Sequence, residues 1–148
     1  MRIELTKEQF KEMLLAAMLY SWVRGGLVDS RGEDFKKYEE LEKYLLKIAK
    51  DNELQDLVEE FHDHLVPTDE LAELEEEIME EYDDDIFWHE LVTRLGGRDF
   101  WRTVTPEERK TVEEKGWLPE RVSGIYEKYE KEFEERGLDR VRIDEEKL

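Results

Sequence analysis

The chain contains 148 residues, of which 44% are charged and 39% hydrophobic, and its formal net charge at pH 7 is -19. This length and apolar share suffice for one globular domain with a sizeable core. The absence of cysteine excludes disulfide bonds, thiolate zinc sites and thiol nucleophiles. The longest apolar run, residues 13–20, is too short to cross a bilayer, and the acidic Glu4 does not fit a signal peptide. We therefore expect a cytoplasmic protein that does not enter a membrane.

The first predicted helix begins at Thr6, which forms a capping-box pattern with Gln9. It is predicted to end near Arg24, because a glycine pair follows at 25–26. Residues 13–20 are apolar on all sides of such a helix. This pattern is typical of a central helix that is buried on most sides, or of one that a second subunit covers.

Four further helical patterns follow in the first two thirds of the chain. An apolar stripe predicts a second helix over residues 34–51, and a shorter third helix is predicted over 54–61. Pro67 then breaks the chain, and a fourth helix is predicted from 69 to 82. Three aspartates at 83–85 fit the start of a fifth helix, which the glycine pair at 96–97 is expected to end.

The last third of the chain has clear helix signals. Thr105, Pro106 and Glu108 supply a cap, a first-turn proline and a third-position acid for a helix that ends near Gly116. A last helix is predicted from 119 or 120 to Arg136. The alternating segments 3–5 and 141–143 could pair as short strands. The sequence therefore predicts an all-α, single-domain bundle over 1–148, with about six to seven helices around a buried N-terminal helix and a small strand pair from the two termini.

The negative charge is concentrated in residues 53–90, which contain 17 acidic residues, all three histidines and no lysine or arginine. Because nucleic acid phosphates attract basic surfaces, this excess disfavours direct nucleic-acid binding. The apolar positions of the fourth predicted helix cluster on one side, and most of its acids lie opposite. The acids with which we expect a basic partner protein to pair are Glu73, Glu76, Glu77 and Glu80. Two other interpretations are a solvated surface that keeps the protein soluble and neutralisation by Arg94, Arg98 and Arg102.

Four residues form a candidate metal site: His62, His64, His89 and Asp85. Imidazole and carboxylate ligands suit zinc, manganese or iron. On a helix, His62 and His64 would point about 160° apart, so both could bind one ion only from a loop or strand. Asp85 and His89 are four residues apart and share one side of a helix. The alternative is two exposed loop histidines and a partly buried His89 with ordinary hydrogen bonds.

The segment Glu76-Glu77-Ile78-Met79-Glu80 resembles the Glu-Glu-x-x-Glu element of all-α nucleoside triphosphate pyrophosphatases. The resemblance implies carboxylates that hold magnesium over a triphosphate. It covers five residues, and the second acidic element of that family, Glu-x-x-Asp, is missing from residues 92–112. Phosphate-binding glycine loops and the Gly-x-Ser-x-Gly nucleophile element are also absent from the sequence.

Residues 4–10 and 137–143 resemble the ends of an uncharacterised prokaryotic all-helical family. The resemblance implies a helical fold but does not indicate any activity. We interpret the chain as a non-enzymatic protein-interaction or regulatory domain, a monomer or homodimer, that presents residues 53–90 to a basic partner. It needs no cofactor, although a divalent metal is compatible with the histidines. The alternative is a metal-dependent hydrolase, similar to the nucleotide pyrophosphatases, that uses the carboxylates and histidines of the same stretch.

Overall fold

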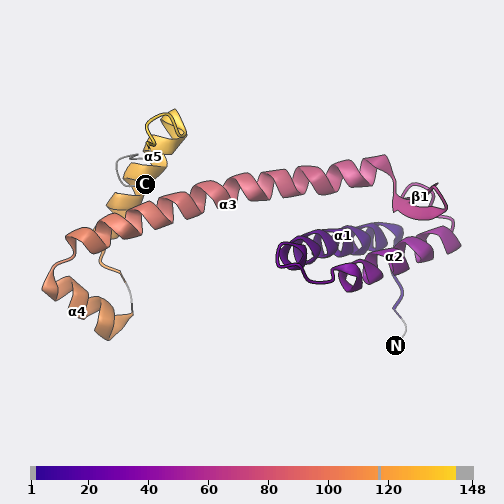
Figure 1. The fold of residues 1–148 in the computed structure, drawn as a ribbon, viewed down its shortest axis with the longest axis horizontal. Coiled ribbons are helices and arrows are strands. Elements are labelled where there is room, and N and C mark those ends of the chain that lie inside the picture. The colour runs from indigo at the N-terminus through magenta and orange to yellow at the C-terminus, as the bar shows by residue number, and fades with distance from the viewer. Residues whose placement is uncertain (1–2, 117, 143–148) are drawn as a thin grey trace. The chain divides into compact units, whose positions relative to one another are not determined.

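The computed structural model describes residues 3–116 and 118–142, which form five helices and one two-stranded antiparallel sheet (Figure 1). The chain divides into two compact units, Met1–Glu81 and Tyr82–Leu148, which we call unit 1 and unit 2. The prediction of a single domain over 1–148 stays a prediction.

Helix α1, Lys7–Asp29, begins as the sequence predicts. The Gln9 amide donates to the Thr6 hydroxyl at 3.2 Å, and the Thr6 amide donates to the Gln9 side chain at 3.0 Å, which completes the capping box. The predicted end near Arg24 is wrong, because α1 continues through the glycines at 25–26. A helical glycine costs only about 1 kcal/mol relative to alanine, and the buried Val28 beyond the pair offsets part of that cost.

Helix α2, Lys36–Asp51, lies side by side with α1, and the two helices supply most of the core of unit 1 (Figure 1). Its start agrees with the prediction within two residues. The backbone turns between the helices at Gly32, whose φ of +69° a glycine adopts without strain. The residues of α2 buried against α1 and its neighbours are Tyr38, Leu45, Leu46 and Ala49.

A β-hairpin replaces the predicted third helix over 54–61. Strand β1, Val58–Phe61, pairs antiparallel with β2, His64–Pro67, in a register that places Val58 opposite Pro67 and Phe61 opposite His64. The two turn residues, His62 and Asp63, have φ values of +48° and +63°. Positive φ at both central residues matches the twist that a two-residue hairpin requires. The prediction failed because four apolar residues over such a short segment fit a helix and a strand equally well.

Helix α3, Asp69–Thr103, is one continuous helix of 35 residues where the sequence predicted two. It crosses the boundary between the units at Glu81 and Tyr82. The aspartates at 83–85 do not start a new helix but lie within α3, where the indole Nε1 of Trp88 donates to Asp84 Oδ1 at 3.0 Å. The glycines at 96–97 do not end it either. No proline separates Pro67 from Pro106, so no backbone donor is missing along α3.

Helices α4, Pro106–Lys115, and α5, Arg121–Arg136, confirm the last two predicted helices. Helix α4 has the expected capping box between Thr105 and Glu108, and it ends at Gly116, whose φ is +71°. The core of unit 2 is formed by the half of α3 that lies within it and by α5, and its buried apolar residues are Val92, Phe100, Val122 and Phe133.

The fold is therefore mostly helical, as predicted, but it has five helices within the described residues rather than six or seven. Residues 3–5 and 141–142 form no strand, and residue 143 of the expected terminal pair lies outside the described part of the chain. The N-terminal helix is buried on one side only. Its exposed side carries Met13, Tyr20, Val23 and Leu27, each 37% to 46% exposed.

Candidate functional site: the acidic surface of α3

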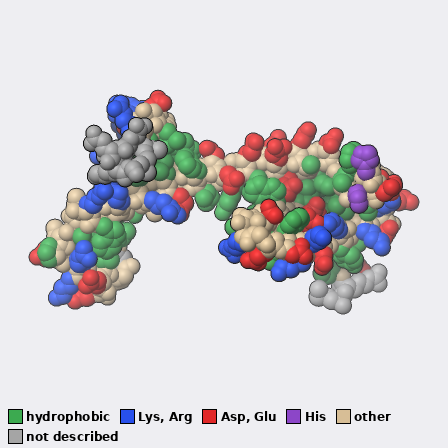
Figure 2. Space-filling view, in the orientation of Figure 1, with side chains coloured by type: hydrophobic (Ala, Val, Ile, Leu, Met, Phe, Trp, Pro, Cys, Tyr) green, Lys and Arg blue, Asp and Glu red, His purple; other side chains and the backbone are tan. Residues whose placement is uncertain are grey.

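The first half of α3 has an apolar side and an acidic side. Leu71 and Met79 are buried, and Leu74 and Ile78 are partly buried against the core of unit 1. Tyr82, which the sequence places on the same side, is 57% exposed. Four exposed glutamates lie on the solvent side, and we call them the acidic surface: Glu73, Glu76, Glu77 and Glu80. Figure 2 shows carboxylate side chains following one another along the outer edge of α3.

Lysines and arginines from outside residues 53–90 form ion pairs with only some of the acids in that stretch. Lys7 Nζ lies 2.8 Å from Asp56 Oδ2, and Lys11 Nζ lies 3.8 Å from Glu70 Oε1. The remaining pairs are Lys50 with Glu60 and Arg94 with Glu90. Within residues 3–116 and 118–142, no ion pair reaches the four glutamates of the acidic surface. Their charge is therefore not neutralised by the described part of the fold.

The arginines that directly follow the acidic stretch also pair elsewhere. Arg94 pairs with Glu90, and Arg98 and Arg102 both approach Asp99. Asp99 accepts a further hydrogen bond from the Tyr129 hydroxyl at 2.5 Å, and these donors hold the pKa of its carboxyl below the ordinary value. The three arginines are thus engaged within unit 2 instead of on the acidic surface.

Sequence reasoning missed a second group of carboxylates in unit 1. Glu42 of α2 and Glu75 of α3 line a pocket of about 600 Å³ together with Ser21 of α1. Ser21 is 9% exposed and lines the same pocket as Glu42. Burial raises the pKa of Glu42, an effect that Ser21 partly opposes and that the nearby Glu39 reinforces. Burial also raises the pKa of Glu75, with the charge of Glu42 as the second cause.

A spacing signal for this pair was present in the sequence. Glu42 follows Tyr38 by four residues and precedes Leu45 by three, so it lies on the buried stripe of α2. Glu75 lies four residues from both Leu71 and Met79, which are buried. An acid at a position that belongs to the apolar side of a helix is more informative than one among many acids on the solvent side.

The four predicted metal ligands lie in different units. His62 is in the hairpin turn and His64 begins β2, both in unit 1, whereas Asp85 and His89 belong to the half of α3 in unit 2. Asp85 and His89 project from the same side of α3, as expected. Among the residues that the structure describes, no group of three or more histidine or carboxylate side chains is placed to hold a metal ion.

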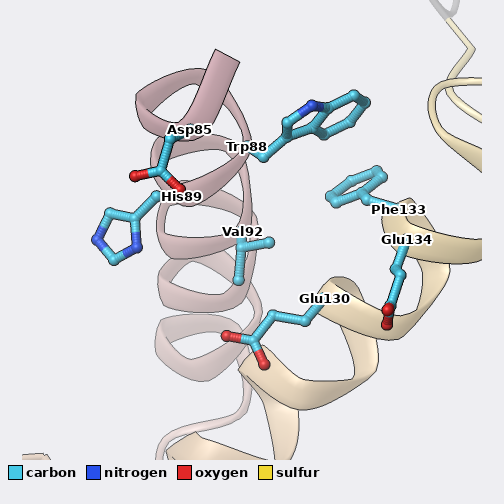
Figure 3. Close-up of a pocket in the computed structure, with 7 residues that line it drawn as sticks. All are labelled: Asp85, Trp88, His89, Val92, Glu130, Phe133 and Glu134. Atoms are coloured by element: carbon cyan, nitrogen blue, oxygen red, sulfur yellow. The ribbon is translucent and has the colours of Figure 1, made fainter. Parts of the chain in front are cut away.

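Asp85 and His89 line a pocket of about 530 Å³ in unit 2 (Figure 3). Helix α5 contributes Glu130 and Glu134 to the same pocket, and its apolar lining residues are Trp88, Val92 and Phe133. The Trp88 and Phe133 rings lie 5.7 Å apart between their centroids. The pocket thus combines an aromatic wall with three carboxylates and one imidazole.

None of the helices in the described residues combines the length and apolar character that a membrane span requires. Comparisons of the chain with protein-family models, with curated proteins and with solved structures find no match.

Proposed function

We propose that this protein is a non-enzymatic interaction or regulatory domain that presents the acidic surface of α3 to a basic partner protein. The observation that supports the proposal is the lack of any ion pair to Glu73, Glu76, Glu77 or Glu80 within the described residues, although lysines of α1 and α2 neutralise other acids nearby.

The arrangement of these glutamates favours a basic partner for an energetic reason. Glu73 and Glu77, and also Glu76 and Glu80, are four residues apart, so each pair of like charges is adjacent on the helix surface. Each such pair destabilises a helix by a few tenths of a kcal/mol. Lysine or arginine side chains of a partner would remove this repulsion and form ion pairs in its place. The negative field would also accelerate encounter with a basic protein at low ionic strength.

The test measures binding of the full chain to a lysine-rich helical peptide, with an equally long glutamate-rich peptide as the negative probe. Glu73→Gln, Glu76→Gln, Glu77→Gln and Glu80→Gln are combined in one variant. The matched control removes the same number of charges from exposed positions of unit 2, by Glu107→Gln, Glu113→Gln, Glu127→Gln and Glu130→Gln.

We expect the acidic-surface variant to bind the lysine-rich peptide at least about tenfold more weakly and with a shallower dependence on salt. The control variant should bind nearly as well as the unmodified protein. Equal weakening in both variants would show attraction to net charge alone and would contradict the proposal. Binding that does not respond to salt would contradict it as well.

The alternative function is a metal-dependent hydrolase similar to the nucleotide pyrophosphatases. The observation in its favour is that Asp85, His89, Glu130 and Glu134 line the same pocket, although the described side chains there form no group placed to hold a metal ion. Magnesium- or manganese-dependent release of pyrophosphate from nucleoside triphosphates, lost in the Asp85→Asn and His89→Ala variants, would support this alternative over the interaction domain. No release from a panel of nucleotides with either metal would reject it.

A further inference from the structure

The exposed side of α1 carries an apolar stripe with a regular spacing. Met13, Ala16, Tyr20, Val23 and Leu27 are all exposed, and they follow one another at intervals of three, four, three and four residues. This interval is the one with which a helix presents a continuous seam to a second helix. The core of unit 1 uses the other side of α1, where Leu14 and Met18 are 0% and 2% exposed. Tyr20 packs edge-on against Tyr38 of α2, with 5.9 Å between the ring centroids, but the exposed part of the stripe faces solvent in unit 1.

Helix α2 and the segment before α1 extend this apolar surface. Leu41 and Tyr44 of α2 are 50% and 62% exposed, and Ile3 and Leu5 are 62% and 41% exposed. These four residues line a groove of about 740 Å³ together with Met13, so they are continuous with the stripe at its N-terminal end. We call the nine residues the α1–α2 surface: Ile3, Leu5, Met13, Ala16, Tyr20, Val23, Leu27, Leu41 and Tyr44.

Charged residues of both signs accompany the α1–α2 surface. Exposed acids at 4, 12 and 40 occur together with Arg24 and Lys37, which both lie against Tyr38. The Arg24 guanidinium carbon and the Lys37 ammonium lie 5.1 Å and 4.8 Å from the centroid of that ring. Because most of the net charge of -19 lies in residues 53–90, two copies repel each other less across the α1–α2 surface than across the acidic surface of α3. A strongly basic partner gains little there, in contrast to the acidic surface of α3.

The size of the surface matches the requirement of a stable dimer. The exposed fractions of these nine residues correspond to on the order of 800 Å² of accessible surface, which is about what each partner contributes to a standard protein interface. Burial of this area between two copies would remove these apolar side chains from water without bringing the glutamates of the acidic surface together.

We propose that the α1–α2 surface is a two-fold symmetric interface between two copies of this chain. In such an interface the same surface of both copies is used, so that the stripe of one α1 packs against the α1–α2 surface of the other. This inference does not depend on the proposed function, because it uses different residues and a different driving force. Apolar association persists at high salt, whereas binding through the acidic surface weakens there.

The first experiment determines the mass of the full chain in solution by light scattering and sedimentation equilibrium at low and high salt. We expect a particle of two chains, each of 17.9 kDa, at both salt concentrations. A Val23→Glu and Tyr44→Glu variant should dissociate at least about 100-fold more readily, since it places charges in the middle of the interface. Both positions are exposed in one copy, and circular dichroism confirms that the variant folds.

The matched control is Phe61→Glu with Tyr82→Glu, which adds the same two charges at apolar positions that are 60% and 57% exposed outside the α1–α2 surface. The control should remain a dimer. A monomeric unmodified protein at concentrations of about 100 µM would overturn the proposal, because a standard interface of this size binds more tightly. Equal dissociation of both variants would overturn it too, as would a dimer that neither variant disrupts.

Single cysteines give an independent measurement, because the chain has no cysteine of its own. The exposed positions Ala16→Cys and Val23→Cys are made in separate chains. Oxidative cross-linking of Ala16→Cys to itself indicates that the two α1 helices meet at residue 16, and cross-linking of Ala16→Cys to Val23→Cys in a mixture indicates antiparallel helices that cross between these positions. A mixture of Val23→Cys and Tyr44→Cys chains tests contact of α1 with α2 of the other copy. Any of the three cross-links supports the interface, and a dimer that forms none of them would overturn it.

Discussion

Gly96 of α3 lies directly against the ring of Tyr126 of α5, so that a Cβ atom at residue 96 would stand 2.2 Å from the Tyr126 Cδ1. This contact explains why a glycine stands at residue 96, in the middle of a long helix. The missing side chain lets the two helices approach closely. Glycine at residue 96 therefore serves helix packing and does not mark a helix end. A Cβ atom at the neighbouring Gly97 would meet no atom within 4 Å.

The two glycines should therefore respond oppositely to the same substitution. Gly96→Ala forces Tyr126 to move and should destabilise unit 2 by about 1–3 kcal/mol, the usual range for overpacking. Gly97→Ala should stabilise the helix by about 0.5–1 kcal/mol, since alanine loses less backbone entropy than glycine. Urea unfolding followed by tryptophan fluorescence measures both changes. A Gly96→Ala protein as stable as the unmodified one would contradict the close contact.

The pair between Glu108 and Arg121 should make unit 2 sensitive to acid. Arg121 and the Thr105 backbone amide both donate to the Glu108 carboxylate and lower its pKa from 4.5 to about 2. A carboxyl whose folded-state pKa lies below its unfolded value stabilises the fold above the unfolded value, and this contribution is lost as the pH falls. We expect the loss of folding stability between about pH 4.5 and pH 2 to be smaller in Glu108→Gln than in the unmodified protein.

The control for this measurement is Glu113→Gln, an exposed glutamate of the same helix that makes no ion pair within the described residues. Its stability should follow the same pH profile as the unmodified protein. If Glu108→Gln and Glu113→Gln behaved alike in thermal unfolding across this pH range, the role of Arg121 would be refuted.

Glu42 should have the opposite effect on unit 1. Burial raises its folded-state pKa above the unfolded value of 4.5, so the ionised form destabilises the fold at neutral pH. The unmodified protein should gain stability as the pH falls through the raised value toward 4.5. Glu42→Gln should already be more stable at neutral pH, by roughly 0.5–2 kcal/mol, since the amide has no charge to bury and can still bond to Ser21.

Glu75→Gln tests whether the two carboxylates act together. Because the charge of Glu42 contributes to the raised pKa of Glu75, removal of either charge relieves part of the same repulsion. The stability gained by the double variant at pH 7 should thus be smaller than the sum of the two single gains. Strictly additive gains in chemical unfolding would show that the pair does not interact.

The acidic surface should destabilise α3 at low ionic strength even without a partner. Replacing Glu76 and Glu80 by glutamine removes the repulsion between them and should raise the free energy of unfolding by a few tenths of a kcal/mol at low salt. The gain should shrink as salt approaches about 1 M, where the Debye length falls to about 3 Å. Thermal unfolding at two salt concentrations measures this difference, and a gain that does not change with salt would argue against charge repulsion.

The helix caps and the amphipathic helices could be predicted from the sequence alone. Thr6 with Gln9, and Thr105 with Glu108, close their hydrogen bonds within four residues, so their partners are fixed by spacing. The exposed glutamates of α3 were also predictable, because the periodicity of Leu71, Leu74 and Ile78 determines which side of the helix meets solvent.

The β-hairpin, the role of the glycines in the helices and the buried carboxylate of Glu42 were decided by contacts between distant segments. Val58–Phe61 became a strand because His64–Pro67 lies opposite it, and a local pattern of four residues does not record its pairing partner. The glycine pairs at 25–26 and 96–97 look like helix ends in the sequence. In the structure, Gly96 is instead the point where α3 closely approaches Tyr126 of α5. The raised pKa of Glu42 likewise depends on burial among residues of other helices. Capping and amphipathicity act over one or two helical turns and are written in the sequence, whereas burial and strand pairing depend on which distant residues the fold brings together.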